Sequence, residues 1–147
     1  MSFWKRILGT ETEQVDYYAE GVDLLQTGRY HEALTSFRLA QRSAPNDAAL
    51  LQQIAITYTR IGMTDDAIRA YRKVLASDSS TPGAHYGLAF LLLHQGDREG
   101  AARHLRNFLA VLPESGDAQQ HVEHARKTLA GLETETATET DGGNEDG

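Results

Sequence analysis

The feature that most constrains this chain is a pattern that returns every 34 residues. Each unit carries a glycine, an alanine five residues later and a large apolar residue four positions after the alanine. The three sets are Gly28, Ala33 and Phe37; Gly62, Ala67 and Tyr71; and Gly96, Ala101 and Leu105. Self-similarity at a fixed period of this length is typical of chains that stack one supersecondary unit on the next. The sequence therefore predicts three tandem units.

Within each unit the apolar residues have the spacing of two helices. Ala33, Phe37 and Ala40 stand at i, i+4 and i+7, which places them on one face of an α-helix. A second pair, Gly21 and Leu24 in the first unit, precedes the shared glycine. Glycine is the preferred residue just after a helix, where the backbone turns left-handed. Each unit is expected to be a helical hairpin that buries its apolar face by stacking on its neighbours.

These residues resemble the tetratricopeptide repeat family. In the first unit the resemblance rests on Tyr17, Gly21, Leu24, Gly28, Tyr30, Ala33, Phe37, Ala40 and Pro45. It extends in register through 102 of the 147 residues, although the second unit has Ser79 where a proline closes the other two. The resemblance implies an all-α fold, a right-handed α-solenoid of three helix-turn-helix repeats with a C-terminal capping helix.

The chain divides into three predicted parts. These are a short amphipathic N-terminal segment over 1–10, a repeat domain over 11–132 and an acidic tail over 133–147. The repeat domain comprises the units 14–47, 48–81 and 82–115 and a capping helix over 116–132, in which Ala118, Val122, Ala125 and Leu129 keep helical spacing. The tail holds six acidic residues and no basic or large apolar residue, so we expect it to be disordered.

The N-terminal segment is a candidate docking element because it gathers Phe3, Trp4, Ile7 and Leu8. Three placements stay open. The segment caps the first repeat, it lies on a membrane surface or a membrane partner, or it enters the groove of a second copy of the chain. The last two placements correspond to a membrane-peripheral assembly subunit and to a self-assembling structural protein. The apolar stretch is too short for a signal peptide.

The repeat resemblance also implies a concave face that is lined by the first helix of each unit. On these helices an apolar, aromatic-rich stripe lies outside the buried consensus set, with a few polar groups beside it. The candidate partner-binding residues are Tyr18, Val22, Leu25, Gln52, Gln53, Ile56, Thr59, Arg60, Tyr86, Phe90 and Leu93. Gly83 and Gly87 are expected to leave room beside them. An exposed apolar patch of this kind usually marks an interaction surface.

Two occupants of this stripe stay open. One is a segment of a partner protein. The other is the chain's own N-terminal segment or C-terminal helix, or a crystal or dimer contact. Some members of the family hold acidic chain ends with lysine, asparagine and arginine side chains. The matching positions here are Tyr18, Val22, Gln53, Gly83 and Gly87, so the resemblance argues against a clamp of that type.

A second pattern is basic and belongs to the second helix of each unit. It consists of Arg38, Arg72 and Arg106 at one repeat position and Arg69 and Arg103 at another. Stacked repeats align these side chains as a basic ladder, which suits an acidic partner or is a solvated helix face. Nucleic acid is disfavoured because the formal net charge is −7 and no base-reading module accompanies the arginines. The acidic tail is a candidate to screen the ladder.

The sequence offers no pattern for catalysis. It lacks a phosphate-binding loop, a dinucleotide fingerprint and a paired-histidine protease motif, and it has no cysteine. His121 and His124 make a poor metal site without a third ligand. We predict a non-catalytic protein–protein interaction module, an adaptor or scaffold with no cofactor, metal or small-molecule substrate. Its expected partner is a protein or peptide, and its expected location is the cytoplasm, free or peripheral to a membrane or large complex.

Overall fold

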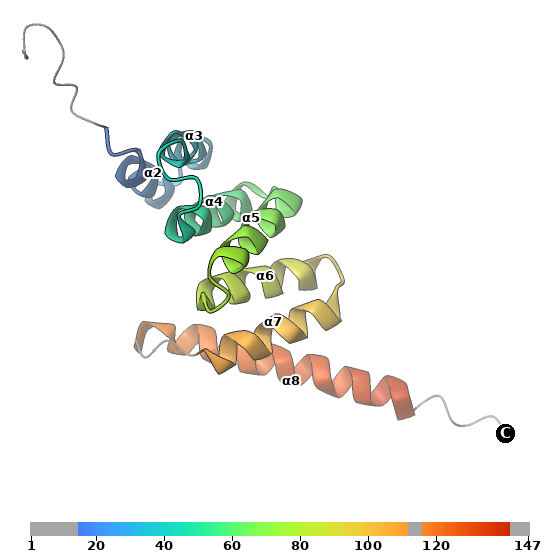
Figure 1. Cartoon of the computed structure of the whole chain (residues 1–147). Helices are drawn as coiled ribbons and strands as arrows, with labels where there is room; N and C mark the ends of the chain where they lie inside the picture. The colour runs from blue at the N-terminus through green and yellow to red at the C-terminus, as the bar shows by residue number, and fades with distance from the viewer. Residues whose placement is uncertain (1–14, 112–115, 142–147) are drawn as a thin grey trace, which may run out of the picture.

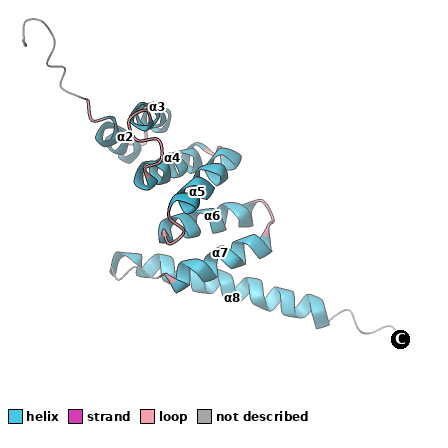
Figure 2. Cartoon of the chain, in the orientation of Figure 1, coloured by secondary structure: helices cyan, strands magenta, loops and turns pink. Residues whose placement is uncertain are grey.

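The computed structural model describes residues 15–111 and 116–141, and each regular element in these ranges is a helix (Figure 1). The elements are α2 (Tyr17–Gln26), α3 (Tyr30–Gln41), α4 (Ala48–Ile61), α5 (Thr64–Ser77), α6 (Pro82–His94), α7 (Arg98–Ala110), the short 3-10 helix η1 (Gly116–Ala118) and α8 (Gln119–Asp141). Helices α2 and α3, α4 and α5, and α6 and α7 form hairpins, and each hairpin packs on the next element along the chain. Figure 2 shows short loops between these helices. The predicted all-α helical-repeat fold is confirmed.

The three repeat glycines lie at the turns of the three hairpins. Their φ angles are 80° at Gly28, 89° at Gly62 and 86° at Gly96. These values lie in the left-handed region that a residue with a Cβ atom avoids. The glycine pattern in the sequence is therefore a pattern of helix ends, as predicted.

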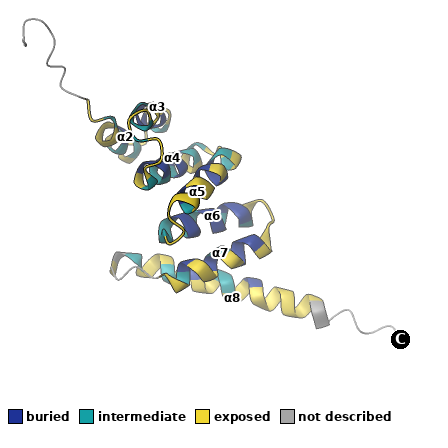
Figure 3. Cartoon of the chain, in the orientation of Figure 1, coloured by how far each residue is buried: buried dark blue, intermediate teal, exposed yellow. Residues whose placement is uncertain are grey.

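The repeated apolar residues form the core between the helices (Figure 3). Ala33, Ala67 and Ala101 have no exposed surface. The small residues let paired helices approach closely, and the ring of Phe37 occupies the space where a side chain on Gly21 would lie. The consensus positions thus supply the packing that holds the hairpins together.

The residues after α7 provide an apolar face for one further helix, but not for the second helix of another hairpin. Helix α8 packs on α7 through Val122, Ala125, Leu129 and Leu132, with Ala125 fully buried. The sequence analysis expected a capping helix over 116–132, and α8 spans Gln119–Asp141. At the positions 34 residues after Ala101 and Leu105, the chain carries Glu135 and Glu139, which cannot enter a core. Within residues 116–141 no second helix folds back, and α8 continues to Asp141.

Residues 133–141 of the predicted acidic tail belong to α8, which runs on to Asp141. Glu133 pairs with Arg106 and Glu135 pairs with Arg98, both on α7. The hydroxyl groups of Thr134 and Thr138 donate hydrogen bonds to carbonyl groups one turn back. Composition alone missed these contacts because the arginines that provide them come from a different unit.

Two predicted segments fall outside the described residues. The N-terminal segment 1–10, with Phe3, Trp4, Ile7 and Leu8, is one, and residues 142–147 of the acidic tail are the other. Across the ranges that are described, none of the helices has both the length and the apolar character needed to cross a bilayer.

Candidate functional site

A hollow of about 780 Å³ opens where α4, α6 and the start of α8 face one another. We call it the α4–α6–α8 hollow. Its lining consists of Gln52, Ile56, Thr59, Arg60, Tyr71, Pro82, Gly83, Tyr86, Gly87, Phe90, Leu91, Phe108, Ala118 and His121. Most of these residues come from the first helices of the second and third repeats, and the capping region closes one end.

Six of the candidate partner-binding residues line this hollow. They are Gln52, Ile56, Thr59, Arg60, Tyr86 and Phe90. The other five are Tyr18, Val22, Leu25, Gln53 and Leu93, and they do not belong to its lining. Val22, Leu25 and Leu93 pack partly buried against the core. Tyr18 lines a separate depression of about 640 Å³ beside Val15, at the opposite end of the repeat array.

Gly83 and Gly87 of α6 were expected to leave open room beside the stripe. Instead, side chains of neighbouring helices occupy the space next to both glycines. A Cβ atom on Gly83 would collide with the side chain of Gln52, and one on Gly87 would collide with the ring of Tyr71. The absence of side chains at these positions lets residues of α4 and α5 lie against the backbone of α6. The glycines therefore shape one wall of the hollow.

Tyr71 is a lining residue that the sequence analysis assigned only to the core. The residue is 4% exposed, yet it belongs to the lining of the hollow together with Thr59 and Arg60. Burial raises the pKa of Tyr71, against the smaller opposing effects of the Thr59 hydrogen bond and the Arg60 charge. The hydroxyl is therefore neutral at physiological pH. The signal was available in the sequence, because Phe37 and Leu105 at the equivalent positions carry no hydroxyl.

Helix α8 brings two imidazoles to Tyr86 and Phe90, and one of them, His121, lines the hollow. His124 stacks on Phe90 with ring centroids 4.5 Å apart, and its Nδ1 lies 2.8 Å from the Tyr86 hydroxyl. His121 meets the Tyr86 ring edge-on at 4.9 Å. Burial raises the pKa of Tyr86, which keeps this hydroxyl protonated as well. The chain's own C-terminal helix thus covers this end of the stripe, while the hollow beside it stays open.

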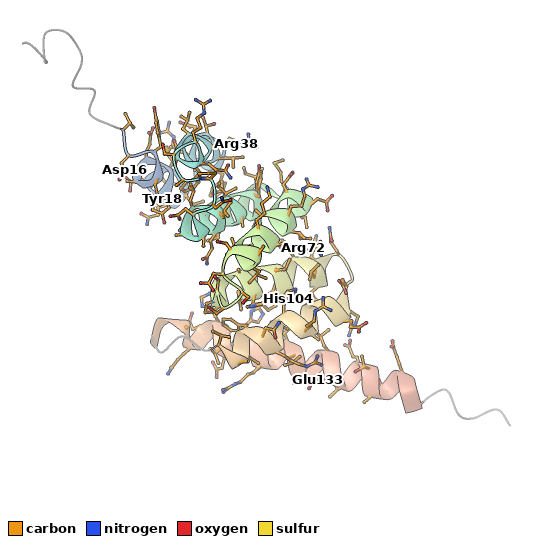
Figure 4. All side chains as sticks on the ribbon, in the orientation of Figure 1. Asp16, Tyr18, Arg38, Arg72, His104 and Glu133 are labelled. Atoms are coloured by element: carbon orange, nitrogen blue, oxygen red, sulfur yellow. The ribbon has the colours of Figure 1, made fainter. Side chains whose placement is uncertain are left out.

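Figure 4 labels two members of the predicted basic ladder, Arg38 and Arg72. The ladder divides into paired and unpaired members. Arg38 donates to the Tyr58 hydroxyl at 2.7 Å, Arg69 pairs with Asp66 on its own helix, and Arg106 pairs with Glu133 at 3.3 Å. Arg72 and Arg103 are exposed and make no ion pair with a carboxylate of residues 15–111 or 116–141. The ladder is therefore not one uniform surface.

The hairpins, their glycine turns and the hollow between first helices define an all-α helical-repeat protein. A sequence profile described as tetratricopeptide repeat matches residues 62–126. The inactive TPR repeat-containing thioredoxin TTL3 of Arabidopsis thaliana is 30% identical over 100 residues, which is 68% of this chain and 14% of that relative's length. The chain is a tetratricopeptide-repeat protein.

Solved structures of similar shape support the fold. The Yersinia enterocolitica type III secretion chaperone SycD, in complex with a peptide of the translocator YopD, superposes with a TM-score of 0.76 and 18% identity. The alignment covers 82% of this chain and 92% of SycD. The first TPR of Spaghetti (RPAP3), bound to the HSP90 peptide SRMEEVD, gives a TM-score of 0.66 and 18% identity over 78% of this chain and 90% of its own. At this level of identity the likeness concerns the fold alone.

Proposed function

We propose that this protein is a non-catalytic adaptor that holds an apolar segment of a partner protein in the α4–α6–α8 hollow. The observation that carries the proposal is the composition of the lining. Ile56, Tyr86, Phe90 and Phe108 supply apolar surface, and polar groups stand at the rim. Binding sites of this type combine an apolar floor with a few polar groups that fix the orientation of the ligand.

The size of the hollow suits side-chain anchors. A volume of about 780 Å³ lies within the range of ligand-binding pockets. Burying one leucine- or phenylalanine-sized side chain contributes about 1.5–3 kcal/mol, so two or three anchors would support a specific complex. The partner segment would supply those side chains from one face of a helix or from an extended strand.

The charges around the hollow indicate a further preference. Among the side chains that the structure describes, its lining contains Arg60 and His121 and no carboxylate. Arg60 is exposed at the rim, where it can pair with an acidic residue next to the apolar anchors. Gln52 and Thr59 stand beside it and can hydrogen-bond the partner's backbone. We therefore expect a segment that is apolar at its centre and acidic on one flank.

The structural neighbours support binding of a peptide, because two of them contain one: a YopD peptide in SycD and an HSP90 peptide in Spaghetti. The positions that would form a lysine and asparagine clamp are Tyr18, Val22, Gln53, Gly83 and Gly87 here. The proposed ligand is therefore held mainly by apolar contacts, and a chain-end carboxylate is not the central feature.

A pair of matched tryptophan variants tests the proposal. Random linear peptides displayed on phage are selected against the full chain, and the affinity of the selected peptides is measured by calorimetry. Thr59→Trp places a large side chain in the hollow. Thr35→Trp makes the same change on α3, where the hydroxyl makes the same type of bond to a carbonyl one turn back. We expect a loss of at least about tenfold for Thr59→Trp alone, or about 1.4 kcal/mol. Equal affinities for both variants would place the peptide elsewhere.

A further inference from the structure

Helices α5 and α7 carry five exposed arginines, of which Arg69 pairs with Asp66 on its own helix. We call the other four, Arg72 on α5 and Arg98, Arg103 and Arg106 on α7, the α5–α7 basic face. These residues belong to the second helices of the repeats, so they are separate from the lining of the hollow. The face is a locally basic surface on a chain whose formal net charge is −7.

The chain already places carboxylates on half of this face. Glu133 of α8 lies 3.3 Å from the guanidinium of Arg106, and Glu135 pairs with Arg98. All four side chains are about half exposed. Ion pairs in such positions are weak and readily exchanged. The distal part of α8, residues 133–141, is thus an acidic helix held on the basic face by replaceable contacts.

The other half of the face has no such partner within residues 15–111 and 116–141. Arg72 and Arg103 lie near enough to His104 for both charges to lower its pKa, after the larger effect of burial and that of His85. Asp97 has a smaller, opposing effect on the same pKa. The Nδ1 of His104 lies 3.1 Å from the Nδ1 of His85, whose Nε2–H donates to the carbonyl of Ser79 at 2.8 Å. Arg72 and Arg103 are thus two exposed cations near an imidazole, and an imidazole supplies no negative charge to balance them.

We propose that Arg72 and Arg103 bind an acidic segment of a partner protein, and that the acidic end of α8 competes with this segment for the neighbouring Arg98 and Arg106. Charge complementarity identifies the partner's chemistry. The chain satisfies two arginines of the face with glutamates borne on a helix, and the same groups would satisfy the other two. A partner segment with several carboxylates would bridge all four arginines after displacing residues 133–141.

The test measures the affinity of a fluorescent oligo-glutamate peptide for the full chain by anisotropy at low ionic strength, where exposed charges act most strongly. Glu133→Gln with Glu135→Gln frees Arg98 and Arg106, and we expect it to tighten binding by about threefold or more. Its matched control is Glu20→Gln with Asp23→Asn, which makes the same change in net charge on the exposed surface of α2. This control should have a much smaller effect.

The complementary variant is Arg72→Gln with Arg103→Gln, which we expect to weaken binding by about tenfold. Its matched control, Arg126→Gln with Lys127→Gln, removes two exposed cations from α8. Equal losses of affinity in the arginine variant and its control would overturn the binding site. Equal gains of affinity in the glutamate variant and its control on α2 would overturn the competition by α8. An oligonucleotide that binds more tightly than oligo-glutamate, and loses this binding in Arg72→Gln with Arg103→Gln, would overturn the protein partner in favour of nucleic acid. Peptides selected for the hollow should bind all four variants unchanged.

Discussion

Tyr18 and Tyr86 occupy the same position in the first and third repeats, yet their surroundings differ. Tyr18 is 37% exposed, and among the residues that the structure describes its one aromatic neighbour is the ring of Phe37, at 6.1 Å. Tyr86 meets Phe90, Phe108, His121 and His124. The difference arises from the next first helix along the array, because α8 contributes two imidazoles and α4 contributes no aromatic ring to Tyr18. The position within a repeat thus determines where a side chain lies on its helix, and the neighbouring unit determines which residues it contacts.

The largest expected effect comes from removing the aromatic cluster at the third repeat. Tyr86→Ala with Phe90→Ala deletes the rings that contact α8, so we expect a loss of about 2–4 kcal/mol in the free energy of unfolding. Tyr18→Ala at the equivalent position should cost about 1 kcal/mol, because that ring has fewer neighbours. Urea unfolding followed by circular dichroism measures both. Similar losses at the two positions would contradict the comparison.

A smaller effect is expected from adding one methyl group to the wall of the hollow. Gly87→Ala directs a Cβ atom at the buried ring of Tyr71, so we expect a loss of about 1–3 kcal/mol. Gly131→Ala is the control, because no atom lies within 4 Å of its Cβ and the residue is inside α8. There the higher helix propensity of alanine should add up to about 1 kcal/mol. A stabilised Gly87→Ala variant would show that the ring of Tyr71 does not rest on α6.

The smallest effect concerns pH and compares His104 with Ser36, its counterpart in the first repeat. The pKa of His104 is lowered in the folded state by burial, by His85 and by Arg103 and Arg72, against an opposing effect of Asp97. The unfolded chain therefore binds a proton first as pH falls below the ordinary value of 6.5, and the stability conferred by the neutral imidazole is lost.

We expect wild type to lose stability between about pH 7.5 and about pH 5.5, and His104→Ser to lose less over the same interval. Thermal melts at a series of pH values measure the difference. The first repeat cannot contribute in the same way, since Ser36 does not titrate. A pH dependence that is identical in the two proteins would assign the effect to other groups.

Much of the fold could be predicted because each helix end and each core contact depends on residues that recur in every unit. Gly62 ends a helix because its backbone adopts a positive φ angle, and Ala67 is buried at the same position as its counterparts in the other two units. Those features repeat with the sequence. The candidate site was only half predicted, since Ile56 and Phe90 line the hollow whereas Val22 and Leu25 pack against the core.

The missed features all depend on contacts between units that do not repeat. Tyr71 reaches the hollow because Gly87 of the next helix has no side chain in its path. His124 becomes part of the aromatic cluster because α8 stands where a fourth repeat would begin. The extension of α8 past Leu132 depends on arginines of α7. A repeating sequence pattern predicts only contacts that recur in each unit. Contacts that occur once in the molecule became visible only in the structure.

The most direct test of the central claim is a methyl NMR titration of the full chain, labelled at isoleucine, with a peptide selected for binding. Ile56 lines the hollow, whereas Ile68 is 5% exposed in the core of α5 and does not belong to the hollow's lining. We predict a saturable shift of the Ile56 methyl signals with the affinity measured by calorimetry, and little change at Ile68. A peptide that binds without moving the Ile56 signals would show that the partner site is not the α4–α6–α8 hollow.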